Sequence, residues 1–277
     1  MKKIIVLLTL FVFISSSVFA FQWPWAKKDT NTLTITGSTT VLPIAQKAAE
    51  EYMDMHPDMN ISIRGGGSSV GIAALIDGTV DIANASRAMK TKELKAAREK
   101  GINAYANVVA KDGIAVIVNP SNGLSEISIE QIAAIYTGEI SNWKQLGQTP
   151  GTIVIISRDN SSGTYEVFNK LALGGGKVRA DAVTLASNNA VAQTVSQTTG
   201  AIGYIGLGYL SDKVKALKVG GVMPSNATVN SGTYKLARPL YMYTNGAPKG
   251  MAKQFIDFIL SSEGQKLVED LGFVPLR

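Results

Sequence analysis

Two kinds of apolar pattern alternate along the chain. Short runs rich in β-branched residues predict strands at 33–36, 60–64, 81–85, 114–118, 152–156, 201–205 and 240–243. Segments in which apolar residues recur every three or four positions predict helices at 44–55, 72–76, 91–100, 129–135, 167–173, 190–196 and 251–260. The run at 114–118 is apolar on both faces, which predicts a central strand. The alternation as a whole predicts an α/β fold with mainly parallel sheets.

Three of the predicted strands run into turns rich in Ser, Thr and Gly, and a predicted helix follows each turn. These turns are Gly37–Thr40, Gly65–Gly71 and Ser157–Glu166. A helix N-terminus gathers four unpaired backbone N–H groups and about half a positive charge, and small hydroxyl residues let a compact anion come close. The three consecutive glycines of the second turn are costly in chain entropy, so they indicate that a ligand or another backbone lies close by.

Arg158 lies at the end of the strand before the third turn and adds a permanently charged, planar donor that suits a tetrahedral oxyanion. For this stretch alone, an equally good interpretation is that Ser161 or Ser162 only caps a helix and that Arg158 is a surface charge. The other two turns repeat the same design, and ligands of such sheets bind beyond the carboxyl ends of the strands. The set of three turns therefore favours an anion site.

Composition indicates an exported protein. The 277 residues include no Cys, and the formal net charge is +6. The first 20 residues combine Lys2 and Lys3, an apolar run from Ile4 to Ile14 and a small residue at Ala20, which is typical of a cleaved signal peptide. Its removal takes away two of the 27 basic residues and none of the 21 acidic ones, which leaves a charge of +4. The remaining basic residues are scattered, so nucleic acid is not implied. We expect a soluble periplasmic protein with no lipid anchor and a flexible leader at 21–31.

An enzyme is poorly supported. Gly67–Gly71 fits the G-x-S-x-G pattern of a hydrolase nucleophile, but that fold needs a His after the Ser, and the only His, His56, precedes it. No cluster of His, Cys or carboxylate residues has metal-ligand spacing, so we expect neither a metal nor a cofactor. Trp143 and Tyr204 are assigned to packing rather than to a ligand.

Six motifs occur in one order over nearly the whole mature chain: Thr36–Val41, Gly65–Gly71, Asn84–Arg87, Lys111–Val116, Ile140–Trp143 and Ser157–Thr164. In these motifs the sequence resembles the PstS family, the periplasmic substrate-binding proteins of phosphate ABC transporters. The resemblance implies the periplasmic binding protein type II fold, with two α/β lobes joined by two hinge strands and a phosphate cleft between them. It places lobe 1 at 32–112 and 235–277 and lobe 2 at 113–234.

The resemblance also implies which residues bind phosphate. The implied set consists of Ser38, Thr39, Thr40, Ser68, Ser69, Ser86, Arg87, Asp112, Arg158, Ser161, Ser162, Gly163 and Thr164. By motif position, the Ser, Thr and Gly residues of the three turns and Arg158 are expected to donate hydrogen bonds to the anion. Burial of a doubly charged anion needs many such donors, because each charge-assisted hydrogen bond returns only roughly 1.5 to 3 kcal/mol.

One position departs from the family pattern. Better-known members carry an Asp where this chain has Arg87, and Asp112 looks like its substitute. An ionised carboxylate would accept the proton of phosphate and repel sulfate, which carries none. Two roles for Arg87 remain open, namely a second phosphate donor and a counter-ion that neutralises Asp112.

The predicted function is high-affinity binding of inorganic phosphate in the periplasm and its delivery to the permease of an ABC transporter. We expect a monomer that closes about a hinge, as periplasmic binding proteins do. The alternatives are a binding protein for another oxyanion, such as sulfate or molybdate, a phosphate-scavenging adhesin-like protein, and, less favoured, a phosphoester hydrolase.

Overall fold

A computed structural model of the chain describes residues 31–276. The predicted signal peptide and nearly all of the predicted leader lie outside the described residues. The first half of the fold contains β1 (Thr32–Gly37), α1 (Leu42–Met55), β2 (Asn60–Gly65), α2 (Ser68–Ile76), β3 (Ile82–Ala85), α3 (Thr91–Glu99), β4 (Ala104–Val118), β5 (Glu126–Ile127) and α4 (Ile129–Thr137). The remainder contains the 3-10 helices η1 (Trp143–Leu146) and η2 (Leu207–Tyr209), β6 (Val154–Arg158), α5 (Gly163–Ala172), β7 (Val183–Leu185), α6 (Asn188–Gln197), β8 (Ala201–Gly206), β9 (Lys215–Ala216), β10 (Lys218–Val219), α7 (Asn226–Asn230), β11 (Ala237–Asn245), α8 (Gly250–Leu260) and α9 (Ser262–Asp270).

The predicted α/β fold is confirmed, but the sheet is more mixed than the pattern indicates. Eight strands follow one another in the order β2-β1-β3-β11-β4-β8-β6-β7, and β9 pairs with β4. The pairs of β1 with β2 and β3, and of β6 with β7 and β8, are parallel. Strand β11 runs antiparallel to β3 and β4, and β4 runs antiparallel to β8 and β9. The hydrophobic pattern cannot reveal this, because strands buried on both faces look alike in either direction.

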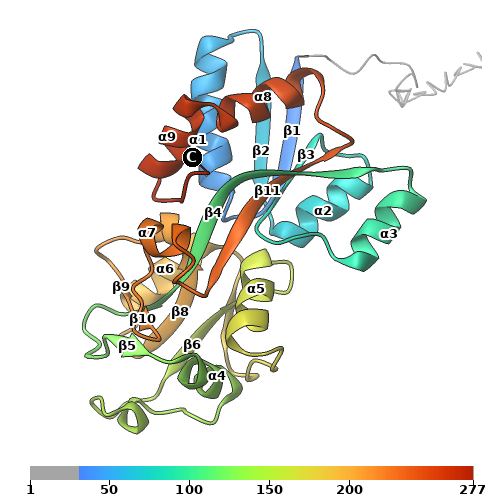
Figure 1. Cartoon of the computed structure of the whole chain (residues 1–277). Helices are drawn as coiled ribbons and strands as arrows, with labels where there is room; N and C mark the ends of the chain where they lie inside the picture. The colour runs from blue at the N-terminus through green and yellow to red at the C-terminus, as the bar shows by residue number, and fades with distance from the viewer. Residues whose placement is uncertain (1–30, 277) are drawn as a thin grey trace, which may run out of the picture. The chain divides into compact units, whose positions relative to one another are not determined.

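The long strands β4 and β11 lie side by side through the middle of the fold (Figure 1). The sequence pattern predicts only the apolar C-terminal end of β4, 114–118, and the apolar middle of β11, 240–243. In the register of this pair, Arg238 stands opposite Asp112. The two polar residues therefore meet where two long strands cross the centre of the protein.

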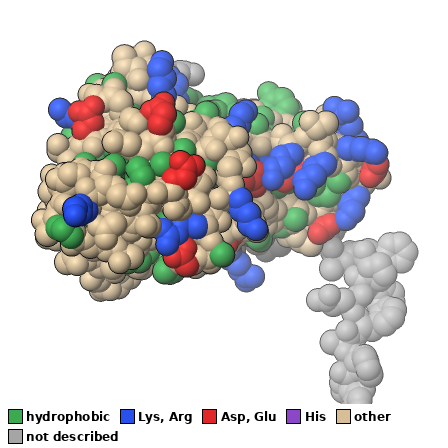
Figure 2. All heavy atoms as spheres, turned by 90° about the horizontal axis from the view of Figure 1, so that it is seen from below, with side chains coloured by type: hydrophobic (Ala, Val, Ile, Leu, Met, Phe, Trp, Pro, Cys, Tyr) green, Lys and Arg blue, Asp and Glu red, His purple; other side chains and the backbone are tan. Residues whose placement is uncertain are grey.

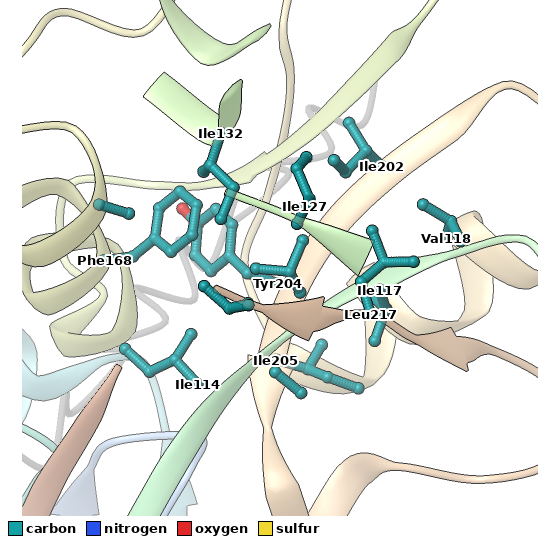
Figure 3. Close-up of a cluster of buried hydrophobic side chains, with 14 of the residues drawn as sticks. Ile114, Ile117, Val118, Ile127, Ile132, Phe168, Ile202, Tyr204, Ile205 and Leu217 are labelled. Carbon is teal, nitrogen blue, oxygen red and sulfur yellow. The ribbon is translucent and has the colours of Figure 1, made fainter. Parts of the chain in front are cut away.

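The hydrophobic core forms separate clusters on either side of the place where β4 and β11 pass through the middle of the fold, which we call the β4–β11 crossing. The largest cluster contains Phe168, Tyr204 and the β4 residues 114–118, and Figure 3 shows several of its members. The rings of Phe168 and Tyr204 stack at 3.9 Å. A second cluster contains residues of β1, α1, α8 and α9, and a third contains residues of α2, β3 and α3. Trp143 and Tyr204 belong to the largest cluster, which confirms their assignment to packing.

Two helices, α2 and α5, begin four residues before the apolar segments that predict them. Helix α2 begins at Ser68, four residues before its predicted apolar segment, so both hydroxyls of its glycine-rich turn belong to its first turn. Helix α5 begins at Gly163, four residues before its predicted segment 167–173. Gly67 has a φ of 95°, and a Cβ at this residue would lie 2.6 Å from the Ser161 carbonyl oxygen. The glycine run thus allows a close approach to another backbone, as the sequence predicts.

Figure 2 shows Lys and Arg side chains mixed with Asp and Glu on the visible face, which agrees with the scattered basic residues of the sequence. Within residues 31–276, no helix is both long and apolar enough to span a bilayer.

Candidate functional site

The three predicted turns come together in the folded chain. The hydroxyl oxygens of Thr40 and Thr164 are hydrogen-bonded at 2.9 Å, although 124 residues separate them in the sequence. The hydroxyl oxygens of Ser68 and Ser86 lie 3.3 Å apart. A Cβ on Gly163 would lie 2.7 Å from the Ser86 hydroxyl oxygen and closer still to that of Ser68. The structure therefore brings hydroxyl groups from α2, α5, the residue after β3 and the β1–α1 turn to one buried place.

Each of the three turns has a hydroxyl that accepts a hydrogen bond from a backbone N–H group. The Ser162 hydroxyl caps α5 by accepting a hydrogen bond from the Tyr165 N–H at 3.2 Å. The Ser38 hydroxyl accepts one from the Thr40 N–H at 3.1 Å, and the Ser68 hydroxyl accepts one from the Ser86 N–H at 3.0 Å. These hydrogen bonds hold one hydroxyl of each turn in place.

Arg158 is 3% exposed at the end of β6. Its Nε donates to the Leu185 carbonyl oxygen at 3.0 Å, and its Nη2 donates to the Ala186 carbonyl oxygen at 2.9 Å and to the Thr39 hydroxyl at 3.3 Å. Its Nη1 is buried and has no hydrogen-bond partner within residues 31–276. Burial lowers the pKa of the Arg158 guanidinium, and the nearby Asp159 opposes that shift. The side chain is thus a rigidly held buried cation with one donor group unused.

Asp112 forms a buried ion pair with Arg238, which sequence reasoning missed. The Asp112 Oδ2 accepts from Arg238 Nη2 at 2.8 Å and from its Nε at 3.2 Å, and Oδ1 accepts from the Leu207 N–H at 2.9 Å. Burial raises the pKa of the Asp112 carboxyl above its ordinary value, and the positive charge of Arg238 opposes this shift. The pair is 0% and 5% exposed, so its charges are well shielded from water.

Arg238 also reaches the hydroxyl groups. Its Nη2 lies 3.0 Å from the Thr164 hydroxyl oxygen and 3.3 Å from that of Thr40. Its Nη1 is buried and, like that of Arg158, has no hydrogen-bond partner among the described residues. The two guanidinium groups and the Asp112 carboxylate together carry a net charge of +1. Such a place suits an anion, because buried donors without partners are costly.

Asn188 is a second residue that the sequence analysis missed. Its side-chain amide donates to the Thr39 hydroxyl at 3.2 Å and to the Thr40 hydroxyl at 3.0 Å, and its carbonyl oxygen accepts from the Gly206 N–H. Asn188 is completely buried at the start of α6. One feature of the sequence could have indicated each missed residue. Arg238 is a charged residue just before the predicted apolar strand 240–243. Asn188 directly follows Ser187, the N-cap residue of α6.

Arg87 lies outside this convergence, and the hypothesis that it neutralises Asp112 is wrong. Arg238 neutralises Asp112 instead, because it stands opposite Asp112 in the β4–β11 pair. Both Nη atoms of Arg87 donate to Glu93, at 2.8 and 2.7 Å. Its Nε forms an ion pair with Glu166 at 3.0 Å. All three nitrogens of the guanidinium are therefore engaged by protein carboxylates.

Two hydroxyl residues of the predicted set are engaged by other protein groups. The Ser69 N–H donates to the Ser161 carbonyl oxygen at 3.0 Å, and the Ser69 hydroxyl bonds to both Arg87 and Glu166. The Ser161 hydroxyl lies within hydrogen-bond distance of both the Asp159 carboxylate and the Gly66 carbonyl oxygen. The buried group that does converge consists of Ser38, Thr39, Thr40, Ser68, Ser86, Asp112, Arg158, Ser162, Gly163 and Thr164, together with Asn188 and Arg238.

Two long paired strands through the middle of an α/β fold, with buried anion donors beside them, are the arrangement of a solute-binding protein. Comparison with known proteins supports this class. Residues 26–263 match the family model described as the PBP superfamily domain. The solved structures that resemble the chain include a candidate phosphate ABC transporter substrate-binding protein from Clostridium perfringens with bound phosphate. That match has a TM-score of 0.83 and 34% identity, and it covers 89% of this chain and 100% of the other. The fold is thus the periplasmic binding protein type II fold.

Curated relatives define the family more closely. The phosphate-binding protein PstS of Bacillus subtilis is 38% identical over 255 residues, which covers 90% of this chain and 82% of the relative. The phosphate-binding protein PstS of Borreliella burgdorferi is 33% identical over 291 residues and is covered completely, as is this chain. The chain therefore belongs to the PstS family of phosphate-binding proteins.

Proposed function

We propose that this protein binds inorganic phosphate and delivers it to a membrane ABC transporter for import. The observation that carries this proposal is the pair of buried Nη1 groups of Arg158 and Arg238, which have no hydrogen-bond partner among the described residues and belong to guanidinium groups that contact hydroxyls from two of the turns. Charge-assisted donors of this kind can offset the cost of removing an anion from water. The names of the relatives and the bound phosphate of the Clostridium perfringens structure support the choice of anion.

In this proposal the converging hydroxyl and amide groups donate to the phosphate oxygens. Arg158 and Arg238 supply the balancing positive charge, and Asn188 holds the hydroxyls of Thr39 and Thr40 in place. We expect a dissociation constant near or below micromolar, which corresponds to about 8 kcal/mol or more. The signal-peptide pattern of the first 20 residues supports a place in the periplasm.

We further propose that lobe 1 comprises 32–112 and 235–277 and that lobe 2 comprises 113–234. The separate hydrophobic clusters on the two sides of the β4–β11 crossing support this division. Closure of the lobes about β4 and β11 would bring donors from both sides to the ligand, and the permease would recognise the closed form.

Asp112 has two roles in the proposal. Its first role is to hold Arg238, because two of its hydrogen bonds come from that side chain. A carboxylate offers about four acceptor sites, so three protein donors leave about one for the proton of phosphate. That remaining acceptor would favour phosphate over sulfate, since sulfate has no proton to offer.

Titration calorimetry with phosphate, arsenate and sulfate tests the function and the role of Asp112 together. We expect tight phosphate binding and at least about 100-fold weaker sulfate binding, in line with discrimination through a lost hydrogen bond in a buried site. Asp112→Asn should lower the ratio of phosphate affinity to sulfate affinity by at least about 10-fold, because the carboxylate charge that repels sulfate is gone. Sulfate binding as tight as phosphate binding in the wild type would contradict the role of Asp112. A protein that prefers sulfate would favour the alternative function.

Gly163→Ala should weaken phosphate binding by at least about 10-fold, because the new methyl group must displace the Ser68 or Ser86 hydroxyl. Gly151→Ala is a matched control, since only Trp143 lies at the 4.0 Å limit from a Cβ at that residue. Calorimetry of both variants gives the comparison. Equal affinity in the two variants would show that Gly163 does not border the anion.

A further inference from the structure

A partly buried cluster of charged side chains lies beside the site and contacts Ser69, which is outside the converging group. Arg87 and Lys90 come from the segment between β3 and α3, and Glu166 lies in the first turn of α5. The Glu166 Oε2 lies 3.0 Å from Arg87 Nε and 2.6 Å from Lys90 Nζ. The Ser69 hydroxyl lies 3.3 Å from the other Glu166 oxygen. We call Arg87, Lys90 and Glu166 the clasp.

The clasp joins elements that pack on different hydrophobic clusters. Helix α5 contributes Phe168 to the largest cluster, whereas Ala85 and Met89 beside Arg87 belong to the third. The same two sides are joined nearby by the Ser69 N–H, which donates to the Ser161 carbonyl oxygen, and by the Ser161 hydroxyl, which donates to the Gly66 carbonyl oxygen at 2.9 Å. The clasp therefore exists only while the two sides are together.

Burial makes this ion pair stronger than an ordinary surface pair. The side chains of Arg87 and Glu166 are 5% and 17% exposed, and only Lys90, at 41%, is open to solvent. Glu93 holds Arg87 in place through two hydrogen bonds, and Arg87 in turn lowers the pKa of the Glu93 carboxyl against the opposing effect of burial. Partly shielded pairs within such networks contribute more than isolated surface pairs do.

We propose that Glu166 is a positioning residue that sets how fast phosphate leaves, by holding the two sides together through Arg87 and Lys90. The inference rests on the proposed function and deepens it. Glu166 carries a negative charge and does not bind the anion itself. Because its ion pairs must break before the sides can separate, the clasp slows release and has little effect on capture. In this proposal Ser69 belongs to the contact between the two sides and not to the phosphate site.

Stopped-flow measurement of phosphate association and dissociation tests the proposal in the full chain. For Glu166→Gln we expect a dissociation rate constant about 5-fold to about 30-fold higher, with an association rate constant within about 2-fold of the wild type. Raising the salt concentration should speed dissociation from the wild type, because it screens the Lys90 pair, and should affect Glu166→Gln less. Lys90→Gln should give a smaller increase, and adding it to Glu166→Gln should add nothing, because both changes break the same pair.

Glu99→Gln is the matched control. It removes the same charge from α3, where Glu99 is exposed and pairs only with Lys95 among the described salt bridges. We expect the kinetics of this variant to match those of the wild type. An unchanged dissociation rate in Glu166→Gln, or an equal change in Glu99→Gln, would overturn the clasp.

Amide hydrogen exchange provides a second readout that needs no phosphate. The Ser69 N–H is protected by the Ser161 carbonyl oxygen of the opposite side, so its exchange reports separation of the two sides. We expect faster exchange at Ser69 in Glu166→Gln than in Glu99→Gln. Equal exchange in both variants would overturn the clasp, whereas a wild type that fails to bind phosphate would overturn the proposed function alone.

Discussion

Replacement of Arg238 by Met should lower the free energy of unfolding by about 3 to 5 kcal/mol, because it leaves the Asp112 carboxylate buried without its counter-ion. Equilibrium denaturation gives this value directly. Arg98→Met on the exposed end of α3 is the control, and a change within about 0.5 kcal/mol is expected there.

The double variant Arg238→Met with Asp112→Asn separates stability from binding. It contains no buried charge at this pair, so at least about half of the lost stability should return, since paired removal of buried charges is often close to neutral. Phosphate affinity should not return, because the Nη1 and Nη2 donors of Arg238 are still missing. Recovery of both properties would mean that Arg238 serves the fold and not the ligand.

Replacement of Arg158 by Met should weaken phosphate binding by at least about 2 kcal/mol, or about 30-fold, because a buried charge-assisted donor is lost. The effect on stability should be smaller than for Arg238, since no carboxylate forms an ion pair with Arg158 among the described salt bridges and its partners are two carbonyl oxygens and a hydroxyl. Calorimetry at constant salt measures the affinity.

Arg158→Lys distinguishes charge from geometry. Lys keeps the positive charge but cannot donate to Leu185, Ala186 and a ligand in one plane, so an intermediate loss of affinity is expected. Affinity equal to that of the wild type in both variants would remove Arg158 from the site.

Much of the site was predictable because its parts are local. A hydroxyl-rich turn between a strand and a helix can be read from neighbouring residues, and the turns at Gly37–Thr40, Gly65–Gly71 and Ser157–Glu166 follow that pattern. Capping by Ser162 and the close approach allowed by Gly67 are local effects as well. A local pattern, however, does not determine which charged residues will form ion pairs with each other.

The errors arise where partners come from distant parts of the chain. Arg87 was expected near Asp112 or the ligand, but Glu93 and Glu166 engage it. Arg238 was not predicted as a site residue. It lies 126 residues after Asp112 in the sequence and is its ion-pair partner in the fold. Strand register decides this pairing, and hydrophobic periodicity leaves the register of central strands open.

By itself, the sequence determined the alternation of strands and helices, the three turns that present hydroxyl groups, and the resemblance to phosphate-binding proteins. These follow from periodicity, turn chemistry and ordered motifs, all of which act over short stretches. Only the tertiary structure decided the direction of β4 and β11, the pairing of Asp112 with Arg238 and the joining of α5 to the β3–α3 segment through Glu166. The physical reason is that a buried charge takes its partner from whichever element the packing brings next to it.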